Sequence, residues 1–235
     1  MIAANESMAV ILRNAARSSI RRVVRSPERW ARIVTLVGGK GTTLPTEPDS
    51  HALNTFLEQQ RAADPDHYPD LALSIIKLLG PGEYVLAQGN DPEPPGHFSL
   101  AALDYTHSTA PNRRYADLVT QRIVKAMLAG EPAPYTDDEL AALAQHLNER
   151  ETAARKVERT MQKRVAAVAL APLVGQQFRG VITGANPKGI FVRVFNPPVE
   201  GRVVSGFEGL DVGDVVTVKL SHTDPLHAFI DFTRA

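Results

Sequence analysis

The hydrophobic pattern of the sequence changes near Pro172, and this change limits the folds that the chain can adopt. Before Pro172, apolar residues recur at the spacing of amphipathic helices, separated by turns rich in glycine and proline. After it, five short runs of valine, isoleucine and phenylalanine alternate with polar residues, a pattern typical of half-buried strands. We therefore expect an α+β chain with a mostly helical part at residues 1–172 and a small β-barrel at residues 173–235.

Helix signals place the elements of the first part. We expect helices at 1–17, 27–38, 51–63, 69–79 and 113–129, short strands near 21–25 and 84–86, and a rigid loop at 89–95. Ser26 and Pro27 suit the N-cap and first position of the second helix. Thr136 and Glu139 form a capping-box pattern, which predicts a long helix from there to Leu170. Its many charged residues predict a solvated, salt-bridged face.

The second part contains short β-type runs separated by glycine- and proline-rich turns. They lie at 178–182, 189–194, 200–204, 215–220 and 229–232. Five short strands with turn signals between them predict a small barrel.

Composition excludes several classes of protein. The chain has 235 residues, 43% of them hydrophobic, which is enough for one large or two small globular domains. It has no cysteine, which excludes disulfides and thiolate metal sites. The 26 basic and 26 acidic residues cancel, so any surface for a polyanion must be local. Without a signal-peptide pattern or a run of roughly 18 apolar residues, we expect a cytoplasmic protein with no membrane partner.

Residues 96–122 concentrate side chains that an ordinary core segment does not need. These are His97, Tyr105, Thr106, His107, Arg113, Arg114, Tyr115 and Asp117. Pro111 suits a helix start, which would place Arg113 and Arg114 in the first turn. Free N–H groups and guanidiniums there favour an anion, and phosphate is the obvious candidate. The alternative is that both arginines pair with neighbouring acids.

This stretch resembles the ribonuclease II (RNB) family of 3′→5′ exoribonucleases. The family pattern is a Gly-His-Phe-Gly-Leu block followed by Tyr-Thr-His-Phe-Thr-Ser-Pro-Ile-Arg-Arg-Tyr-Ala-Asp-Leu. The matching residues are Gly96, His97, Phe98, Leu100, Tyr105, Thr106, His107, Thr109, Pro111, Arg113, Arg114, Tyr115, Ala116, Asp117 and Leu118. The departures are Ser99, Ser108, Ala110 and Asn112. Met1, Ala4, Asn5 and Glu6 match a second family block.

The resemblance implies a function and a role for single residues. Residues 1–172 would be the carboxy-terminal part of a catalytic domain that hydrolyses single-stranded RNA with magnesium held by aspartates. Those aspartates would lie upstream of residue 1, so the chain alone is expected to be inactive. Arg113 would clamp the scissile phosphate, and Arg114, His97 and Tyr105 would support that geometry or touch RNA. Glu158 would lie near the channel for the RNA 3′ end.

The terminal strands resemble the OB-fold RNA-binding domain named after ribosomal protein S1. The match rests on Val174, Gly175, Phe178, Gly180, Gly189, Phe191, Val192, Val212, Gly213, Asp214 and Val216. The resemblance implies that Phe178 and Phe191 stack on bases while Lys188, Arg193 and Arg202 hold phosphate. The alternative is that both phenylalanine rings belong to the barrel core.

Three hypotheses follow from these patterns. The first is part of an exoribonuclease, whose upstream half carries the magnesium site on the same or a separate chain. The second is a non-catalytic module that binds single-stranded RNA. The third is a structural domain without RNA contact. No set of carboxylates in the sequence has the spacing of a metal site, and Arg21, Arg22 and Arg25 form a basic cluster that is either solvated or an RNA contact.

Overall fold

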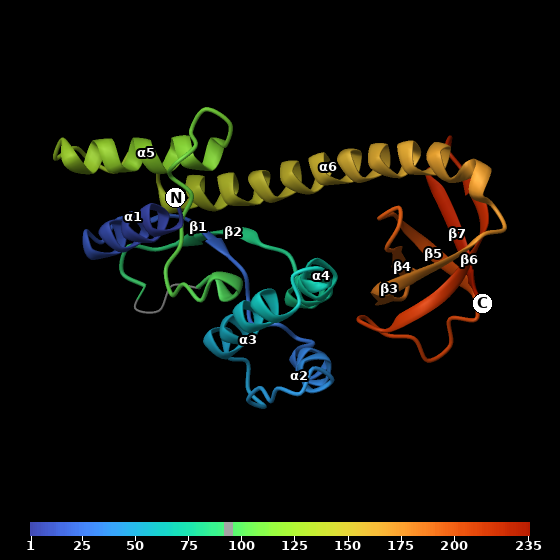
Figure 1. Ribbon diagram of the computed structural model, residues 1–235. Coiled ribbons are helices and arrows are strands. Elements are labelled where there is room, and N and C mark those ends of the chain that lie inside the picture. The colour runs from blue at the N-terminus through green and yellow to red at the C-terminus, as the bar shows by residue number, and fades with distance from the viewer. Residues whose placement is uncertain (92–95) are drawn as a thin grey trace. The chain divides into compact units, whose positions relative to one another are not determined.

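The chain forms two compact units in a computed structural model, in which residues 1–91 and 96–235 are described (Figure 1). The first unit contains Met1–Pro27, Pro48–Asn54 and Leu79–Ala153. The second contains Glu28–Glu47, Thr55–Leu78 and Ala154–Ala235. Residues 92–95 of the loop predicted at 89–95 lie outside the described residues. The domain boundary at 172/173 stays a prediction.

The first unit is built on a two-stranded antiparallel sheet. Its elements are α1 (Ile2–Asn14), β1 (Ser19–Val23), β2 (Glu83–Ala87), η1 (Phe98–Leu100), α5 (Tyr115–Leu128) and the first half of α6 (Asp137–Leu170). In the sheet, Ser19 pairs with Ala87 and Val23 with Glu83. Leu12, Ile20, Val119, Ile123 and Leu140 form its buried core, so the helices pack their apolar stripes around the sheet.

The second unit contains the barrel. Its elements are α2 (Trp30–Gly38), most of α3 (Ser50–Ala63), α4 (Tyr68–Leu79) without its last residue, the second half of α6, η2 (Ala171–Leu173), β3 (Gln177–Asn186), β4 (Gly189–Val194), β5 (Glu200–Ser205), β6 (Val215–Asp224) and β7 (Phe229–Arg234).

The strands close in the order β3-β4-β5-β7-β6, and only β5 and β7 pair in parallel. The predicted five-stranded barrel is therefore confirmed. Its buried core includes Ile182, Val192 and Phe232, and Ala167 and Leu170 of α6 pack into the same cluster. The last turns of α6 thus belong to the core of the barrel.

The predicted helices are present, but two of them begin later than expected. α2 begins at Trp30 rather than Pro27, with Arg29 at its N-cap and no side chain capping it. α5 begins at Tyr115 rather than Arg113, because Arg114 is extended at the N-cap. Asp117 explains this start, since its Oδ1 atom accepts hydrogen bonds of 2.8 Å from both the Ala110 amide and the Arg114 guanidinium. The turn before α5 is therefore held in place by a residue inside the helix.

The capping box at the start of α6 is confirmed. The Thr136 amide donates to Glu139 Oε2 at 2.8 Å, and the Glu139 amide donates to Thr136 Oγ1 at 3.3 Å. Reciprocal bonds of this kind satisfy amides that a helix start leaves without partners. No helix in the described parts of the chain has the length and apolarity needed to cross a bilayer.

The tight packing of β5 against β7 gives a first prediction. A Cβ atom added to Gly201 would lie 2.5 Å from the Ile230 carbonyl oxygen and 2.5 Å from the Phe232 ring. We expect Gly201→Ala to lower the free energy of unfolding by about 1–3 kcal/mol, as overpacking of a core does. The control is Gly38→Ala, where no atom lies within 4 Å of the added Cβ. Equal melting temperatures of the two variants would contradict the close approach.

Candidate nucleic-acid interface

Aromatic rings from the motif at 96–122 form a cluster in the first unit. Tyr105 lies between His97, at 5.1 Å, and His107, at 5.8 Å, measured between ring centroids. Tyr84 on β2 packs edge-on against His107 at 5.7 Å, and a 2.9 Å hydrogen bond joins its hydroxyl to His107 Nδ1. The rings therefore connect the motif to the small sheet.

Asn5 ties α1 to this cluster. Its side chain is buried, and its Nδ2 atom donates to the Tyr105 hydroxyl at 3.0 Å. Its Oδ1 atom accepts two 3.0 Å hydrogen bonds, from the amide and the hydroxyl of Ser108. Tyr105 is only 6% exposed, and its hydroxyl already has an internal partner. Tyr105 thus lies where it can position its neighbours, whereas His97 is half-buried at the edge of the cluster.

The predicted basic cluster at 21–25 does not form one surface. Arg21 and Arg22 are buried, so both interpretations offered for them, a solvated face or an RNA contact, are wrong. Arg21 pairs with Asp104 at 3.4 Å and donates to the Ala9 carbonyl. Arg22 donates hydrogen bonds to both carboxylate oxygens of Glu151, at 2.7 and 3.2 Å, and its guanidinium lies over the Tyr84 ring. β1 is buried along its whole length, which explains why its arginines point into the protein.

Arg25, the third arginine of the predicted cluster, is the one that lies on the surface. It is exposed and pairs with Glu83 of β2 at 2.6 Å.

Arg113 and Arg114 have different surroundings, and neither lies in the first turn of a helix as predicted. Arg114 pairs with the buried Asp117 at 2.8 Å, so for this residue the alternative of pairing with an acid holds. Arg113 is exposed in the turn before α5. Within residues 1–91 and 96–235, no acidic side chain is paired with it. Arg113 thus keeps its charge available to a ligand, and its predicted role as a phosphate clamp stays a prediction.

The pKa values of the two histidines in the cluster, His97 and His107, are lowered, which favours the neutral form. Burial and the nearby Arg22 lower the pKa of His97 to about 4. Burial and Arg114 lower the pKa of His107 to about 4, although Asp117 opposes the shift. Both imidazoles are therefore neutral at pH 7 and available as hydrogen-bonding groups.

The acidic side chains of this region do not fit a magnesium site. Asp104 is shared by Arg13 and Arg21, Asp117 is bound to Arg114, and Glu151 to Arg22. Among the residues whose positions are described, no group of three or more histidine, aspartate or glutamate side chains converges as metal ligands would.

In the second unit, a row of neighbouring residues crosses the outer face of the barrel. Gly184 on β3 pairs with Phe191 on β4, Phe191 pairs with Arg202 on β5, and Arg202 pairs with Asp231 on β7. Phe191 is half-buried, and a Cβ on Gly184 would lie 3.3 Å from its ring. The absence of a side chain at Gly184 thus leaves this aromatic ring accessible beside an arginine.

Cations surround Phe191 from several elements. Lys163 of α6 lies 5.5 Å from the centre of the Phe191 ring. Two surface cavities of about 480 and 340 Å³ share Phe191, Lys163 and Lys188 in their walls. Arg159 lines the first cavity and Arg202 the second.

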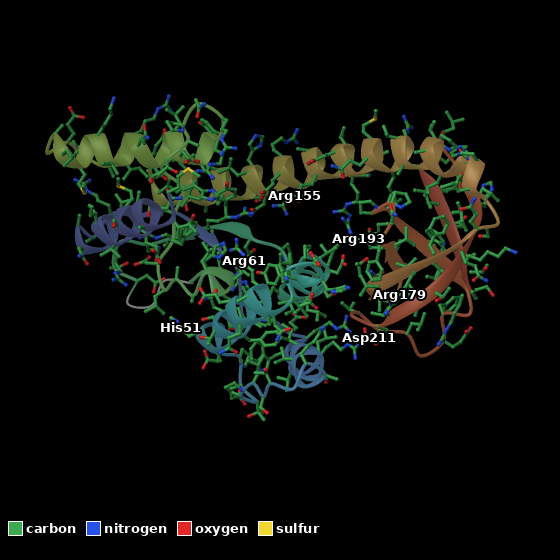
Figure 2. All side chains as sticks on the ribbon, in the orientation of Figure 1. His51, Arg61, Arg155, Arg179, Arg193 and Asp211 are labelled. Carbon is green, nitrogen blue, oxygen red and sulfur yellow. The ribbon has the colours of Figure 1, made fainter. Side chains whose placement is uncertain are left out.

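We call the surface formed by Phe191 and the cations around it the basic face. Its cations are Arg159, Lys163, Lys188, Arg193 (Figure 2) and Arg202. Among the described side chains, none of these cations forms an ion pair with an acid. Each of the two cavities also has one acid in its wall, Glu200 in the first and Asp231 in the second, so cations are in excess. The basic face therefore joins an accessible aromatic ring to an excess of positive charge, a combination suited to single-stranded nucleic acid.

Four predicted RNA-binding residues lie on the basic face, namely Phe191, Lys188, Arg193 and Arg202, and their role in RNA binding stays a prediction. The contribution of α6 was not predicted. We expected the charged residues of α6 to form a salt-bridged solvated face, whereas Arg159 and Lys163 line cavities. The available signal was their spacing of four residues, which puts both on one side of the helix.

Two other predicted RNA-binding residues, Phe178 and Glu158, have contacts different from those of Phe191. Phe178 is half-buried and packs edge-on against the buried Phe232, with ring centroids 6.3 Å apart. This placement matches the alternative that Phe178 belongs to the barrel core. Glu158 is exposed on α6 and accepts a 3.3 Å hydrogen bond from Gln162. Its role near the RNA 3′ end stays a prediction.

Comparison with known families and proteins finds two matching regions, one before the barrel and one at the barrel. Residues 1–130 match the RNB domain, and residues 176–235 match the RNase II-type exonuclease C-terminal S1 domain. Ribonuclease R of Aquifex aeolicus is 29% identical over 211 residues, which cover 86% of this chain and 28% of that protein. The chain spans less than a third of the length of the curated relatives that it matches.

Solved structures confirm the α+β fold with its terminal barrel. RNase R of Mycoplasma genitalium, in complex with ribose methylated single-stranded RNA, has a TM-score of 0.75 at 24% identity. That match covers 100% of this chain and 40% of the other. Yeast Ssd1, described as a pseudonuclease, has a TM-score of 0.63 at 20% identity, covering 86% of this chain and 25% of the other.

The neutral histidines give a prediction for the pH dependence of stability. Because the folded pKa of His97 and of His107 is about 4, against about 6.5 in the unfolded chain, the unfolded state binds more protons between these values. We therefore expect the melting temperature to fall as the pH is lowered from about 6.5 to about 4. His107→Gln should reduce this fall, and His146→Gln, at an exposed site on α6, should not. Identical pH profiles for wild type and His107→Gln would contradict the placement of His107.

Proposed function

This chain belongs to the RNB domain family, and we propose that it is the carboxy-terminal part of a 3′→5′ exoribonuclease that hydrolyses single-stranded RNA to nucleotides. In this proposal the chain supplies the RNA-binding surface and a phosphate clamp. The upstream catalytic half of the enzyme, on the same or a separate chain, supplies the carboxylates that hold magnesium. Magnesium and a cytoplasmic location stay parts of the proposal.

The observation that carries the proposal is the basic face. A local excess of lysine and arginine side chains attracts phosphates, and binding releases the counterions that screen the nucleic acid. An aromatic ring accepts any base as a stacking partner, which favours single strands without a sequence preference. The net charge of the chain is zero, so the local excess of cations around Phe191 marks one surface and not the whole molecule.

In the first unit, Arg113 is the residue that we propose to contact a phosphate. Its guanidinium is exposed and no described acid is paired with it, so it can stabilise charge that develops on a phosphate. Arg114 would act indirectly, because it holds the turn through Asp117. His97 and Tyr105 would shape the surface around that turn through their ring contacts.

We propose that these 235 residues bind RNA without cleaving it. Hydrolysis with metal ions needs several carboxylates that converge within a few ångströms. The carboxylates of the motif, Asp104 and Asp117, are committed to arginines, which supports a metal site formed by residues outside this chain.

A second candidate is a non-catalytic module that binds single-stranded RNA. It is favoured by the same commitment of carboxylates, and the pseudonuclease Ssd1 shares the fold. The two candidates differ in what happens when an upstream catalytic half is added: RNA is shortened in the first case and stays intact in the second.

Binding of a single-stranded RNA oligomer to the purified chain tests the proposal. We expect Phe191→Ala to weaken binding about tenfold, since stacking of one base contributes about 1–3 kcal/mol. Phe207→Ala is the matched control, because Phe207 is 40% exposed on the barrel and lines neither cavity beside Phe191. Fluorescence anisotropy measures both variants. Equal affinities for the two variants, or no binding by the wild-type chain, would contradict the proposal.

A further inference from the structure

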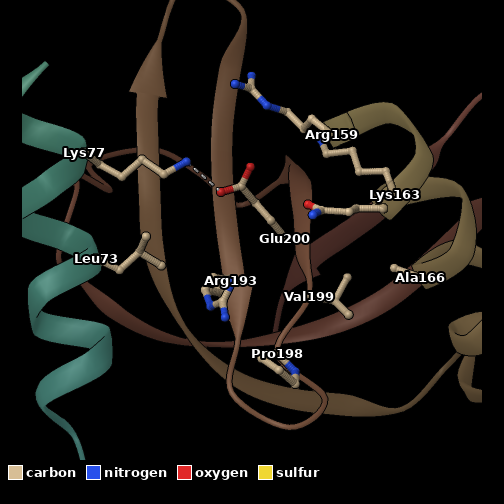
Figure 3. Close-up of a pocket in the computed structure, with 10 residues that line it drawn as sticks. Leu73, Lys77, Arg159, Lys163, Ala166, Arg193, Pro198, Val199 and Glu200 are labelled. Atoms are coloured by element: carbon tan, nitrogen blue, oxygen red, sulfur yellow. Dashed lines mark hydrogen bonds and ion pairs between the residues drawn. The ribbon is translucent and has the colours of Figure 1, made fainter. Parts of the chain in front are cut away.

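A third cavity in the second unit has both charge signs in its wall (Figure 3). Its volume is about 250 Å³, and α4, α6 and the barrel line it. The charged side chains are Lys77, Arg159, Lys163, Arg193 and Glu200. In Figure 3, Glu200 lies between Lys77 on one side and Arg159 and Lys163 on the other. The cavity thus contains one carboxylate and four cationic side chains.

Glu200 uses only one of its carboxylate oxygens inside the protein. Its Oε2 atom accepts hydrogen bonds from the Thr183 hydroxyl at 2.9 Å and from Lys77 at 3.2 Å. For Oε1, no donor is found in the part of the chain that is described. Burial alone would raise the pKa of Glu200, but Lys77, the Thr183 hydroxyl and Lys163 hold it below the usual value. The carboxylate is therefore ionised at neutral pH, with one oxygen free to accept.

The cations of this cavity are not neutralised by Glu200. Only Lys77 forms an ion pair with it. Arg193 lies directly opposite Glu200 in the β4–β5 register, yet no ion pair joins them. Among the described residues, Arg159 and Lys163 likewise form no ion pair, although the charge of Lys163 acts on Glu200. The cavity therefore contains two kinds of binding group: several cations that can bind an anion, and one carboxylate oxygen that can accept a hydrogen bond.

These two kinds of binding group favour a ligand that carries both an anion and a hydrogen-bond donor. A bare phosphate would be attracted by the cations but repelled by Glu200. A sugar phosphate satisfies both, because its hydroxyl groups can donate to the carboxylate while its phosphate contacts the cations. Leu73 and Val199 add an apolar wall for the face of the sugar or base.

We propose that this cavity binds one ribonucleotide unit, with its phosphate held by Arg159, Lys163 and Arg193 and a ribose hydroxyl donating to Glu200 Oε1. The proposal rests on the proposed function and adds a specificity-determining residue to it. A 2′-hydroxyl is the group by which a protein tells RNA from DNA at a given site. Glu200 would therefore favour RNA over DNA, whereas stacking on Phe191 accepts both.

The test measures binding of uridine 5′-monophosphate, its 2′-deoxy analogue and inorganic phosphate to the 235-residue chain by calorimetry. We expect the ribonucleotide to bind at least about fivefold more tightly than the deoxynucleotide, and phosphate more weakly than either. Glu200→Ala should abolish this preference and strengthen phosphate binding. Glu208→Ala, which removes an exposed carboxylate outside the three cavities, should keep it.

Two further variants serve as controls, one for misfolding of Glu200→Ala and one for stacking on Phe191. Glu200→Gln keeps the shape of the side chain and removes the charge, so it replaces Glu200→Ala if that variant does not fold, and we expect it to strengthen phosphate binding. The same titrations in Phe191→Ala exclude stacking on that ring as the source of the preference. Equal affinities for the two nucleotides in the wild-type chain, or a preference that persists in Glu200→Ala, would overturn the inference.

An RNA oligomer separates the two sources of a ribonucleotide. Competition between the oligomer and uridine 5′-monophosphate would assign the cavity to a unit of the strand, and simultaneous binding would assign it to a free nucleotide. Failure of the proposed function has a different signature, since the oligomer would then not bind, while the preference between the two nucleotides would still be measurable.

Discussion

A buried charge needs a partner, and this constraint divides the basic residues of the chain into two sets. In the first unit, Arg21, Arg22 and Arg114 are paired with Asp104, Glu151 and Asp117. In the second unit, Lys163 and Arg202 lie at cavities and form no ion pair with an acid among the residues described. The acids of the motif are thus used for folding, and a chain with no net charge still presents a basic face.

The paired set explains why so much of the motif at 96–122 is polar. Asn5 holds Tyr105 and Ser108, and Asp117 holds the turn that carries Arg113. Removing one member of a buried ion pair typically costs about 3–5 kcal/mol, because the other charge then stays buried alone. Most polar residues of the motif are therefore structural in this chain, and they leave Arg113 exposed beside this hydrogen-bond network.

Local signals predicted most of the helices and strands because their causes are local, although α2 and α5 begin later than predicted. The capping box of Thr136 and Glu139 and the alternation along β4 and β5 each depend on residues close in sequence. The fate of single charges was not predictable in the same way. Arg22 finds Glu151 across 129 positions, so no sequence window contains both partners. Hydrophobic spacing shows which side of α6 is polar, but not that Arg159 and Lys163 would meet β4 there.

We propose that this chain binds RNA and that cleavage needs groups from outside these 235 residues. The most direct measurement incubates the purified 235-residue chain with an end-labelled single-stranded RNA oligomer and magnesium, and follows complex formation and oligomer length together. We expect a complex in which the oligomer keeps its full length. Progressive shortening of the oligomer by this chain alone would contradict it.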